Sequence, residues 1–332
     1  MKNFWVAIAV LSAVLCGFLG YNIANRKPVY LQVAGERPKI AELGDSIDEA
    51  LKVDPKLIIG KEEGRFSTGF KELRGVAVGP EDRIYVTGDK ALVILDSAGK
   101  QIAKTDLDKP GLNVGVGADG TAYVSLTDHI EVFDAKGART AVWEKLGPLG
   151  WITSIAVGEK EVYAADFGYK TVYRYDKTGK ILGRLGGPGP QPGTGPYEVP
   201  SPYFDVAIDP AGRPWVAHVG KQRIESYKAD DSLDSTWGKQ GNNIYGFSGC
   251  CNPSHIAVRK DGTFVTSEKG LVRVKIHAAS GDLVGVVAPA KDFEKGIHGL
   301  DLAVDSKDRI LVADPGTASV RVYVVKGTAS NP

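Results

Sequence analysis

Apolar and polar positions alternate along most of the chain in short runs, and one composite run recurs six times. Each copy has an apolar strand with one small residue inside it, then a polar turn, then a second apolar strand. The copies read GVAVGPEDRIYV from Gly75, NVGVGADGTAYV from Asn113, SIAVGEKEVYA from Ser154, DVAIDPAGRPWV from Asp205, HIAVRKDGTFV from His255 and DLAVDSKDRILV from Asp301. Period-two alternation predicts half-buried strands, and a spacing of about 40 to 50 residues is that of propeller blades.

A third strand follows each pair, and in the first five units a fourth strand comes after it, as in TVYRYDKTGK and then KILGRLG. The Asp-Gly pairs at 119–120 and 261–262 provide the positive φ of hairpin turns, as does the glycine after most third strands. Four antiparallel strands repeated six times predict an all-β, six-bladed β-propeller.

The two ends of the repeat array suggest how the ring closes. The sixth unit ends after its third strand, near Gly327, so it lacks an outer strand. The segment Lys56-Leu57-Ile58-Ile59-Gly60 resembles the outer strand KILG of another unit. We therefore expect 56–60 to pair with the last blade, which would remove two exposed sheet edges.

These repeats resemble NHL repeats, which have an apolar-Ala-Val strand, a Tyr-Val strand and then Arg-Val-x-apolar-Tyr-Asp-x-x-Gly. The resemblance covers residues 55 to 327. It implies a six-bladed propeller fold. Propellers of this type include protein-binding, carbohydrate-binding and RNA-binding modules and a zinc-dependent amidating lyase, so the resemblance leaves the function open.

The N-terminal segment has a different character. Residues 4–21 carry no charge and are long enough to cross a bilayer core. We expect 1–27 to be a signal-anchor or transmembrane helix, 28–54 a linker with a short helix, 55–327 the propeller and 328–332 a tail. The propeller is expected on the extracytoplasmic side of the membrane. The alternative is secretion after cleavage of a signal peptide.

Charge and cysteine content limit the function further. The net charge is +1 and no basic patch carries interleaved aromatics, so no nucleic-acid partner is expected. Three cysteines cannot form a multi-disulfide framework. No nucleophile elbow, phosphate loop, HExxH or EF-hand motif is present, so the sequence names no reaction.

Candidate site residues lie at the end of each second strand. Equivalent positions in a cyclic array are expected at similar depth around the central channel. They should lie on the face that carries the second-to-third strand loops and the connections between blades, which we call the loop-rich face. The alternative for each aspartate is a cap on its own loop, and for His218 a plain surface role. The positions are Gly88, Leu126, Asp166, His218, Ser267 and Asp314, with Glu268 and Lys269 following Ser267.

The sequence Gly249-Cys250-Cys251-Asn252-Pro253 is a second candidate, with His255 close behind it. Neighbouring Cα atoms lie about 3.8 Å apart, less than the usual disulfide span, so a bond between the two cysteines would be strained and reducible. A vicinal disulfide, redox exchange and metal ligation remain as alternatives. The lyase resemblance would place histidines before the inner strands. His255 stands two residues before Ala257 but His298 five before Ala303, so the two registers disagree.

The function expected from these patterns is a membrane-tethered binding module, whose ligand is a protein, peptide or glycan. One alternative is a metal-dependent lyase or lactonase-like hydrolase at the channel mouth. A minor alternative is a redox partner that uses Cys250 and Cys251. No cofactor is predicted, and a divalent metal belongs only to the enzyme alternative.

Overall fold

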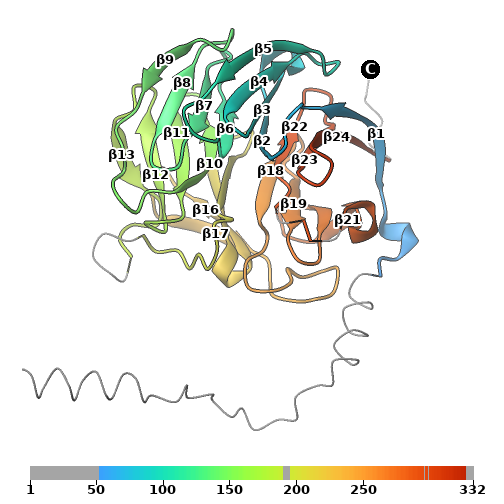
Figure 1. The fold of residues 1–332 in the computed structure, drawn as a ribbon. Coiled ribbons are helices and arrows are strands. Elements are labelled where there is room, and N and C mark those ends of the chain that lie inside the picture. The colour runs from blue at the N-terminus through green and yellow to red at the C-terminus, as the bar shows by residue number, and fades with distance from the viewer. Residues whose placement is uncertain (1–51, 190–194, 295, 298, 327–332) are drawn as a thin grey trace, which may run out of the picture. The chain divides into compact units, whose positions relative to one another are not determined.

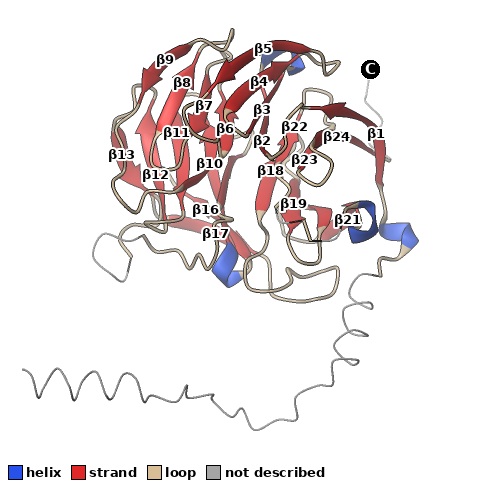
Figure 2. Cartoon of the chain, viewed as in Figure 1, coloured by secondary structure: helices blue, strands red, loops and turns tan. Residues whose placement is uncertain are grey.

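The described residues form six four-stranded antiparallel sheets around a central channel (Figure 1, Figure 2). The computed structural model describes residues 52–189, 195–294, 296–297 and 299–326. The first three blades, from inner to outer strand, are β2 (Leu73–Val78), β3 (Ile84–Gly88), β4 (Ala91–Leu95) and β5 (Gln101–Asp106); β6 (Asn113–Val116), β7 (Ala122–Ser125), β8 (Ile130–Phe133) and β9 (Arg139–Val142); and β10 (Ile152–Val157), β11 (Glu161–Asp166), β12 (Thr171–Asp176) and β13 (Ile181–Arg184). The fourth and fifth are β14 (Asp205–Ile208), β15 (Pro214–His218), β16 (Arg223–Tyr227) and β17 (Leu233–Trp237), then β18 (His255–Val258), β19 (Phe264–Glu268), β20 (Arg273–His277) and β21 (Leu283–Ala288). The predicted six-bladed propeller is confirmed.

The sixth blade closes the ring with a strand from the start of the described chain. It consists of β22 (Leu302–Val304), β23 (Ile310–Asp314), β24 (Ser319–Val325) and the outer strand β1 (Gly60–Ser67). The expected N-terminal outer strand is present, but the segment 56–60 was placed too early: only its end joins blade six, where Lys326 N–H donates to the Ile59 carbonyl at 2.8 Å and Gly60 begins the strand. Asp54 caps a 3₁₀ turn, η1 (Pro55–Leu57), and Ile58 makes a parallel bridge to Val286 of blade five. The pairing with β24 then runs from Gly60 to Ser67.

The inner strands approach one another closely around the channel, which explains the small residue in each. β2 contacts β6, β6 contacts β10, and the series continues through β14, β18 and β22 back to β2. At Gly115 of β6, a Cβ atom would lie 2.8 Å from the carbonyl oxygen of Ile155 in β10. A larger side chain there would push two blades apart.

The hydrophobic core lies between neighbouring blades. Every residue of β3 and β4 is buried, whereas the outer strand β5 is exposed or half-buried throughout. Aromatic side chains bridge the blades: the Trp215 ring of β15 meets the Phe264 ring of β19 edge-on, with centroids 4.7 Å apart. Large apolar area thus holds each blade against the next.

The remaining three short 3₁₀ turns of the described residues add little to the core. They are η2 (Pro80–Asp82), η3 (Val219–Lys221) and η4 (Ala290–Asp292). None of the helices in the described residues is long and apolar enough to span a membrane. The predicted membrane segment 4–21, the linker helix before Val53 and the tail 328–332 lie outside the described residues or at their edge.

Candidate functional site

A ring of six residues, one from each blade and five of them with a side chain, lies at the loop-rich end of the channel. Each residue stands two positions before the small residue of its strand. In four blades the side chain accepts a hydrogen bond from a backbone N–H of the next blade, so the ring links the blades. The ring consists of Gly75, Asn113, Ser154, Asp205, His255 and Asp301. The four bonds run to Asn113 Oδ1 from Ile155 (2.9 Å), to Ser154 Oγ from Val206 (3.2 Å), to Asp205 Oδ2 from Ile256 (2.6 Å) and to Asp301 Oδ2 from Val76 (2.8 Å).

Three consecutive blades bring Asp205, His255 and Asp301 together in this ring. One potential ligand atom from each lies within 4.8 Å of the others. His255 Nδ1 is 3.3 Å from Asp301 Oδ1 and 3.7 Å from Asp205 Oδ2. Both carboxyl groups are buried, and buried Nδ1 makes no hydrogen bond of acceptable geometry despite these two acceptors. An imidazole nitrogen facing two carboxylates needs either a proton or a cation between them.

The charges in the cluster are strongly coupled. Burial raises the pKa of Asp205 to about 6, and the Asp301 carboxylate adds to the rise while His255 opposes it. Burial lowers the pKa of His255, but the Asp301 and Asp205 carboxylates outweigh that effect and raise it above its ordinary value. Without a cation, therefore, the cluster favours a protonated imidazole between the two acids.

The donor set also fits a divalent metal ion. One imidazole nitrogen with two carboxylate oxygens suits Zn²⁺ or Mn²⁺. Ligands about 2.05 Å from a tetrahedral ion lie roughly 3.3 Å apart, close to the two distances from His255 Nδ1. Each carboxylate oxygen that accepts a backbone N–H keeps a second lone pair. Three protein ligands with a fourth position open are typical of catalytic metal sites.

A cavity of about 330 Å³ opens above His255 at the channel mouth. Its wall is mixed: Trp151 and Tyr203 contribute aromatic surface, and Lys71 and Arg74 contribute positive charge. The Tyr203 ring meets the His255 ring edge-on at 6.3 Å. The lining residues belong to the loop-rich face: Lys71, Glu72, Leu73, Arg74, Leu112, Trp151, Thr153, Pro202, Tyr203, His255, Gly299 and Pro315.

Asp166 holds the backbone of a cavity-lining residue, Trp151, in place. Its carboxylate accepts hydrogen bonds from the backbone N–H of Trp151 (2.6 Å) and of Tyr169 (2.5 Å). Burial raises its pKa to about 6 in spite of these bonds. The side chain therefore acts as the loop cap that was the alternative, and it fixes Trp151 in the cavity wall.

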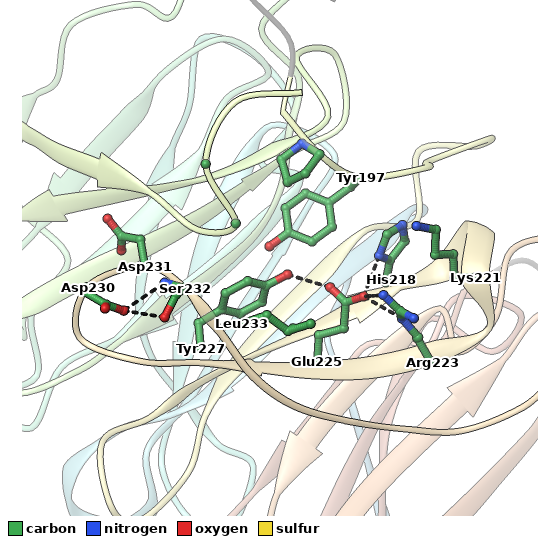
Figure 3. Close-up of a pocket in the computed structure, with 13 residues that line it drawn as sticks. Tyr197, His218, Lys221, Arg223, Glu225, Tyr227, Asp230, Asp231, Ser232 and Leu233 are labelled. Atoms are coloured by element: carbon green, nitrogen blue, oxygen red, sulfur yellow. Dashed lines mark hydrogen bonds and ion pairs between the residues drawn. The ribbon is translucent and has the colours of Figure 1, made fainter. Parts of the chain in front are cut away.

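His218 is buried rather than at the surface, so the plain surface alternative is wrong for it. Its Nε2 accepts the backbone N–H of Glu198 at 2.9 Å, so the proton lies on Nδ1, which donates to Glu225 at 2.8 Å. Glu225 also accepts from Tyr227 (2.5 Å) and Arg223 (2.6 Å). The bond from Glu198 fastens the loop after β13 onto blade four, and Figure 3 shows the bonds that hold Glu225 to His218, Arg223 and Tyr227.

These groups line a second cavity, of about 490 Å³, between blades three and four. Tyr197 lies above Tyr227 in Figure 3, and its hydroxyl points toward the Tyr227 hydroxyl. His218 has both ring nitrogens engaged and Glu225 has three donors, whereas the buried Tyr197 hydroxyl makes no hydrogen bond of acceptable geometry. The cavity is distinct from the channel mouth.

Glu268 and Asp314 end the second strands of blades five and six and are also engaged internally. Glu268 is fully buried and forms ion pairs with Arg273 and Lys275, both at 2.8 Å. Asp314 accepts the N–H of Gly316 at 3.0 Å and lies 3.3 Å from Arg321. Pairing with β20 shows that Glu268, not Ser267, occupies the second-strand position equivalent to His218. These side chains do not meet at the channel, whose described lining comes from the inner strands.

The turn that carries the two cysteines lies beside this region. Cys250 is exposed and Cys251 is buried, and their sulfurs are 3.1 Å apart without a disulfide. Asn252 exchanges hydrogen bonds with the backbone of Lys269: Lys269 N–H donates to Oδ1 at 2.8 Å, and Nδ2 donates to the Lys269 carbonyl at 3.0 Å. No His, Asp or Glu among the described residues joins the cysteines in a metal-type cluster.

Sequence reasoning found His255 but missed Asp205 and Asp301. The signal was present, because both aspartates stand two residues before the small residue of their strand, as His255 does before Ala257. His298, which set the conflicting register, lies outside the described residues.

Comparison with known proteins identifies the fold. No family model matches the chain, and no curated protein matches it in sequence. A structural-genomics protein of unknown function from Bacteroides thetaiotaomicron matches with a TM-score of 0.55 and 15% identity over 80% of this chain and 73% of that one. A streptogramin B lyase matches with a TM-score of 0.56 and 11% identity over 82% of this chain and all of the other. Virginiamycin B lyase from Staphylococcus aureus matches with a TM-score of 0.54 and 13% identity over 77% and 83%. At such identities the shared property is the six-bladed propeller.

Proposed function

We propose that the protein binds a divalent cation through Asp205, His255 and Asp301 and acts on a small organic molecule in the cavity above them. The reaction class is that of a metal-dependent lyase or lactonase-like hydrolase. The observation that carries the proposal is the convergence of three potential ligand atoms within 4.8 Å of one another, in a cluster whose His255 lines an open cavity.

Three further features support the proposal. The buried Nδ1 of His255 faces two carboxylates without a hydrogen bond, as expected of an atom that binds a cation. Trp151 and Tyr203 contribute aromatic surface to the cavity wall, as suits an organic ligand. Among solved propellers of this shape, two are named streptogramin B or virginiamycin B lyases.

Elemental analysis of the full chain, purified without a histidine tag, tests the cation. We expect about one divalent metal per chain in the wild type and none in Asp301→Asn, whose amide oxygen still accepts the N–H of Val76. Ser154→Ala removes a ring side chain that lies outside the cluster and should keep the metal. Metal absent from the wild type, or equal in all three proteins, contradicts the proposal.

Mass spectrometry of reaction products tests the chemistry. Streptogramin B and a panel of lactones are suitable substrates. Hydrolysis adds the mass of one water, whereas ring opening by elimination leaves the mass unchanged and creates a new double bond. Turnover that needs the metal and is lost in Asp301→Asn supports an enzyme. Metal binding without turnover of any panel member favours the second candidate.

That second candidate is a non-catalytic module that binds a peptide, glycan or partner protein at the same mouth. It is favoured by the way each ring carboxylate is already engaged by a backbone N–H of a neighbouring blade. Tethering of the propeller outside the membrane by residues 4–21 is compatible with both candidates and is part of the proposal. Protease protection of the propeller in sealed cells or vesicles would test it.

A further inference from the structure

The two adjacent cysteines differ in exposure in a way that assigns them different roles. Cys250 is exposed, whereas Cys251 is 3% exposed, and the two sulfurs are 3.1 Å apart. An attacking thiol must be accessible, whereas a resolving thiol only needs to reach its neighbour. Cys250 meets the first requirement and Cys251 meets the second.

The turn is held rigidly on both sides of the pair. Before it, the Ser248 N–H and hydroxyl both donate to the Glu268 carboxylate, at 3.0 and 3.2 Å. Glu268 is in turn fixed by its ion pairs with Arg273 and Lys275. After the pair, Asn252 donates to the Ser248 carbonyl at 2.7 Å and exchanges two bonds with Lys269. A change in the turn is therefore transmitted to Lys269.

Lys269 connects the turn with the cavity at the channel mouth. Its ammonium donates to Ser201 Oγ at 2.9 Å and lies 4.6 Å above the centroid of the Tyr203 ring. Tyr203 forms part of the cavity wall and touches His255 edge-on. Asn252, Lys269 and Tyr203 thus form a continuous path from the thiols to the proposed site.

We propose that Cys250 and Cys251 are a thiol–disulfide exchange site for low-molecular-weight disulfides, and that closing their disulfide weakens ligand binding at the channel mouth. The exchange chemistry stands on the cysteine pair alone. The effect on binding rests on the proposed function.

The exchange is balanced as follows. The Cys250 thiolate attacks one sulfur of a disulfide RSSR, the S–S bond breaks, and the first RS⁻ leaves and takes up the Cys250 proton. The Cys251 thiolate then attacks the Cys250 sulfur, and the second RS⁻ leaves and takes up the Cys251 proton. Two electrons pass from the cysteines to RSSR, giving one protein disulfide and two RSH. Because adjacent cysteines are closer than the usual disulfide span, excess RSH should reverse the reaction.

Closure requires the two sulfurs to move about 1 Å closer together, since a disulfide bond is about 2.05 Å long. We expect the peptide between the cysteines to rotate on closure and to displace Asn252 from the Lys269 backbone. Loss of one such hydrogen bond corresponds to about a fivefold change in an equilibrium constant. We expect the equilibrium between the observed position of Tyr203 and its displaced positions to change by about the same factor.

The test treats the full chain with glutathione disulfide or reduced glutathione and maps peptides by mass spectrometry. The peptide with both cysteines should lose two hydrogens on oxidation and regain them on reduction. Cys251→Ser should stop at a glutathione adduct on Cys250, while Cys250→Ser should react slowly because Cys251 is buried. An unchanged cysteine peptide, or faster adduct formation in Cys250→Ser than in Cys251→Ser, overturns the exchange site.

Two readouts separate this inference from the proposed function. Hydrogen exchange at the Lys269 N–H should be about fivefold faster in the oxidised protein, whatever the cavity binds. The affinity for Mn²⁺, measured by titration calorimetry, should also fall about fivefold on oxidation. In Asn252→Ala the oxidised and reduced proteins should bind Mn²⁺ with the same affinity. Equal exchange rates in both states overturn the coupling. Fast exchange with no Mn²⁺ binding in either state leaves the coupling intact and contradicts the proposed function.

Discussion

Replacing Glu225 with glutamine removes the charge at the centre of the network that holds His218. Glu225 is 2% exposed and accepts hydrogen bonds from His218, Tyr227 and Arg223. Burial alone would raise its pKa, but the hydrogen bonds from His218, Tyr227 and Arg223 lower it from the usual 4.5 to about 2. That difference corresponds to about 3 kcal/mol of folding free energy at neutral pH.

The sign of the pH dependence follows from the lowered pKa. Stability from the carboxylate is fully present above the unfolded value of 4.5 and is lost as the pH falls through about 2. Glu225→Gln should therefore reduce the free energy of unfolding by about 3 kcal/mol at pH 7 and by only about 1 kcal/mol at pH 3. Urea unfolding at both pH values measures the two differences.

Glu159→Gln is the matched control, because Glu159 is exposed in the turn after β10. It should change the stability by less than about 0.5 kcal/mol at either pH. A loss below about 1 kcal/mol for Glu225→Gln at pH 7, or a loss that does not shrink in acid, would refute the reasoning. His218 would then be free for a role other than fastening the loop to blade four.

Two further predictions concern the ring closure and the cavity wall. Gly60→Ala should lower the melting temperature, because the new Cβ would lie 2.1 Å from the Val287 carbonyl oxygen. Gly64→Ala in the same strand is the control: its Cβ would meet nothing within 4 Å, so the stability should not change. The difference in unfolding free energy should be about 1–3 kcal/mol by thermal or urea unfolding; equal stability would contradict the register of β1. Asp166→Ala should leave the N–H of Trp151 without its acceptor, costing about 1–3 kcal/mol, and shift Trp151 fluorescence. An unchanged emission spectrum would show that the wall does not depend on Asp166.

The blade architecture was predictable because the same pattern of strands and turns occurs in six copies along the sequence. The small residue of each inner strand, such as Gly115, is required by the close approach of the blades. The closing strand was misplaced because its residues give little hydrophobic signal. In β1, exposed and half-buried positions simply alternate. The apolar residues Ile58 and Ile59 attracted the assignment instead, although they lie against blade five and its neighbour.

The site was only partly predictable because register decides which side chains meet. His255 was singled out as a histidine, but aspartates are common in such repeats, so Asp205 and Asp301 gave no signal of their own. Their shared position before the small residue becomes informative only when three blades are compared. The second-strand residues Asp166, His218 and Glu268 were expected at the channel, yet each accepts hydrogen bonds from loop residues instead. Sequence alone does not reveal those loop partners.

Calorimetric titration of the metal-free full chain with Mn²⁺ tests the central claim most directly. The account predicts one site per chain in the wild type and in Ser154→Ala. It predicts at least a tenfold loss of affinity in Asp301→Asn and in His255→Asn, about 1.4 kcal/mol or more. No binding by the wild type, or equal binding by Asp301→Asn, would contradict the assignment of Asp205, His255 and Asp301 as a cation site.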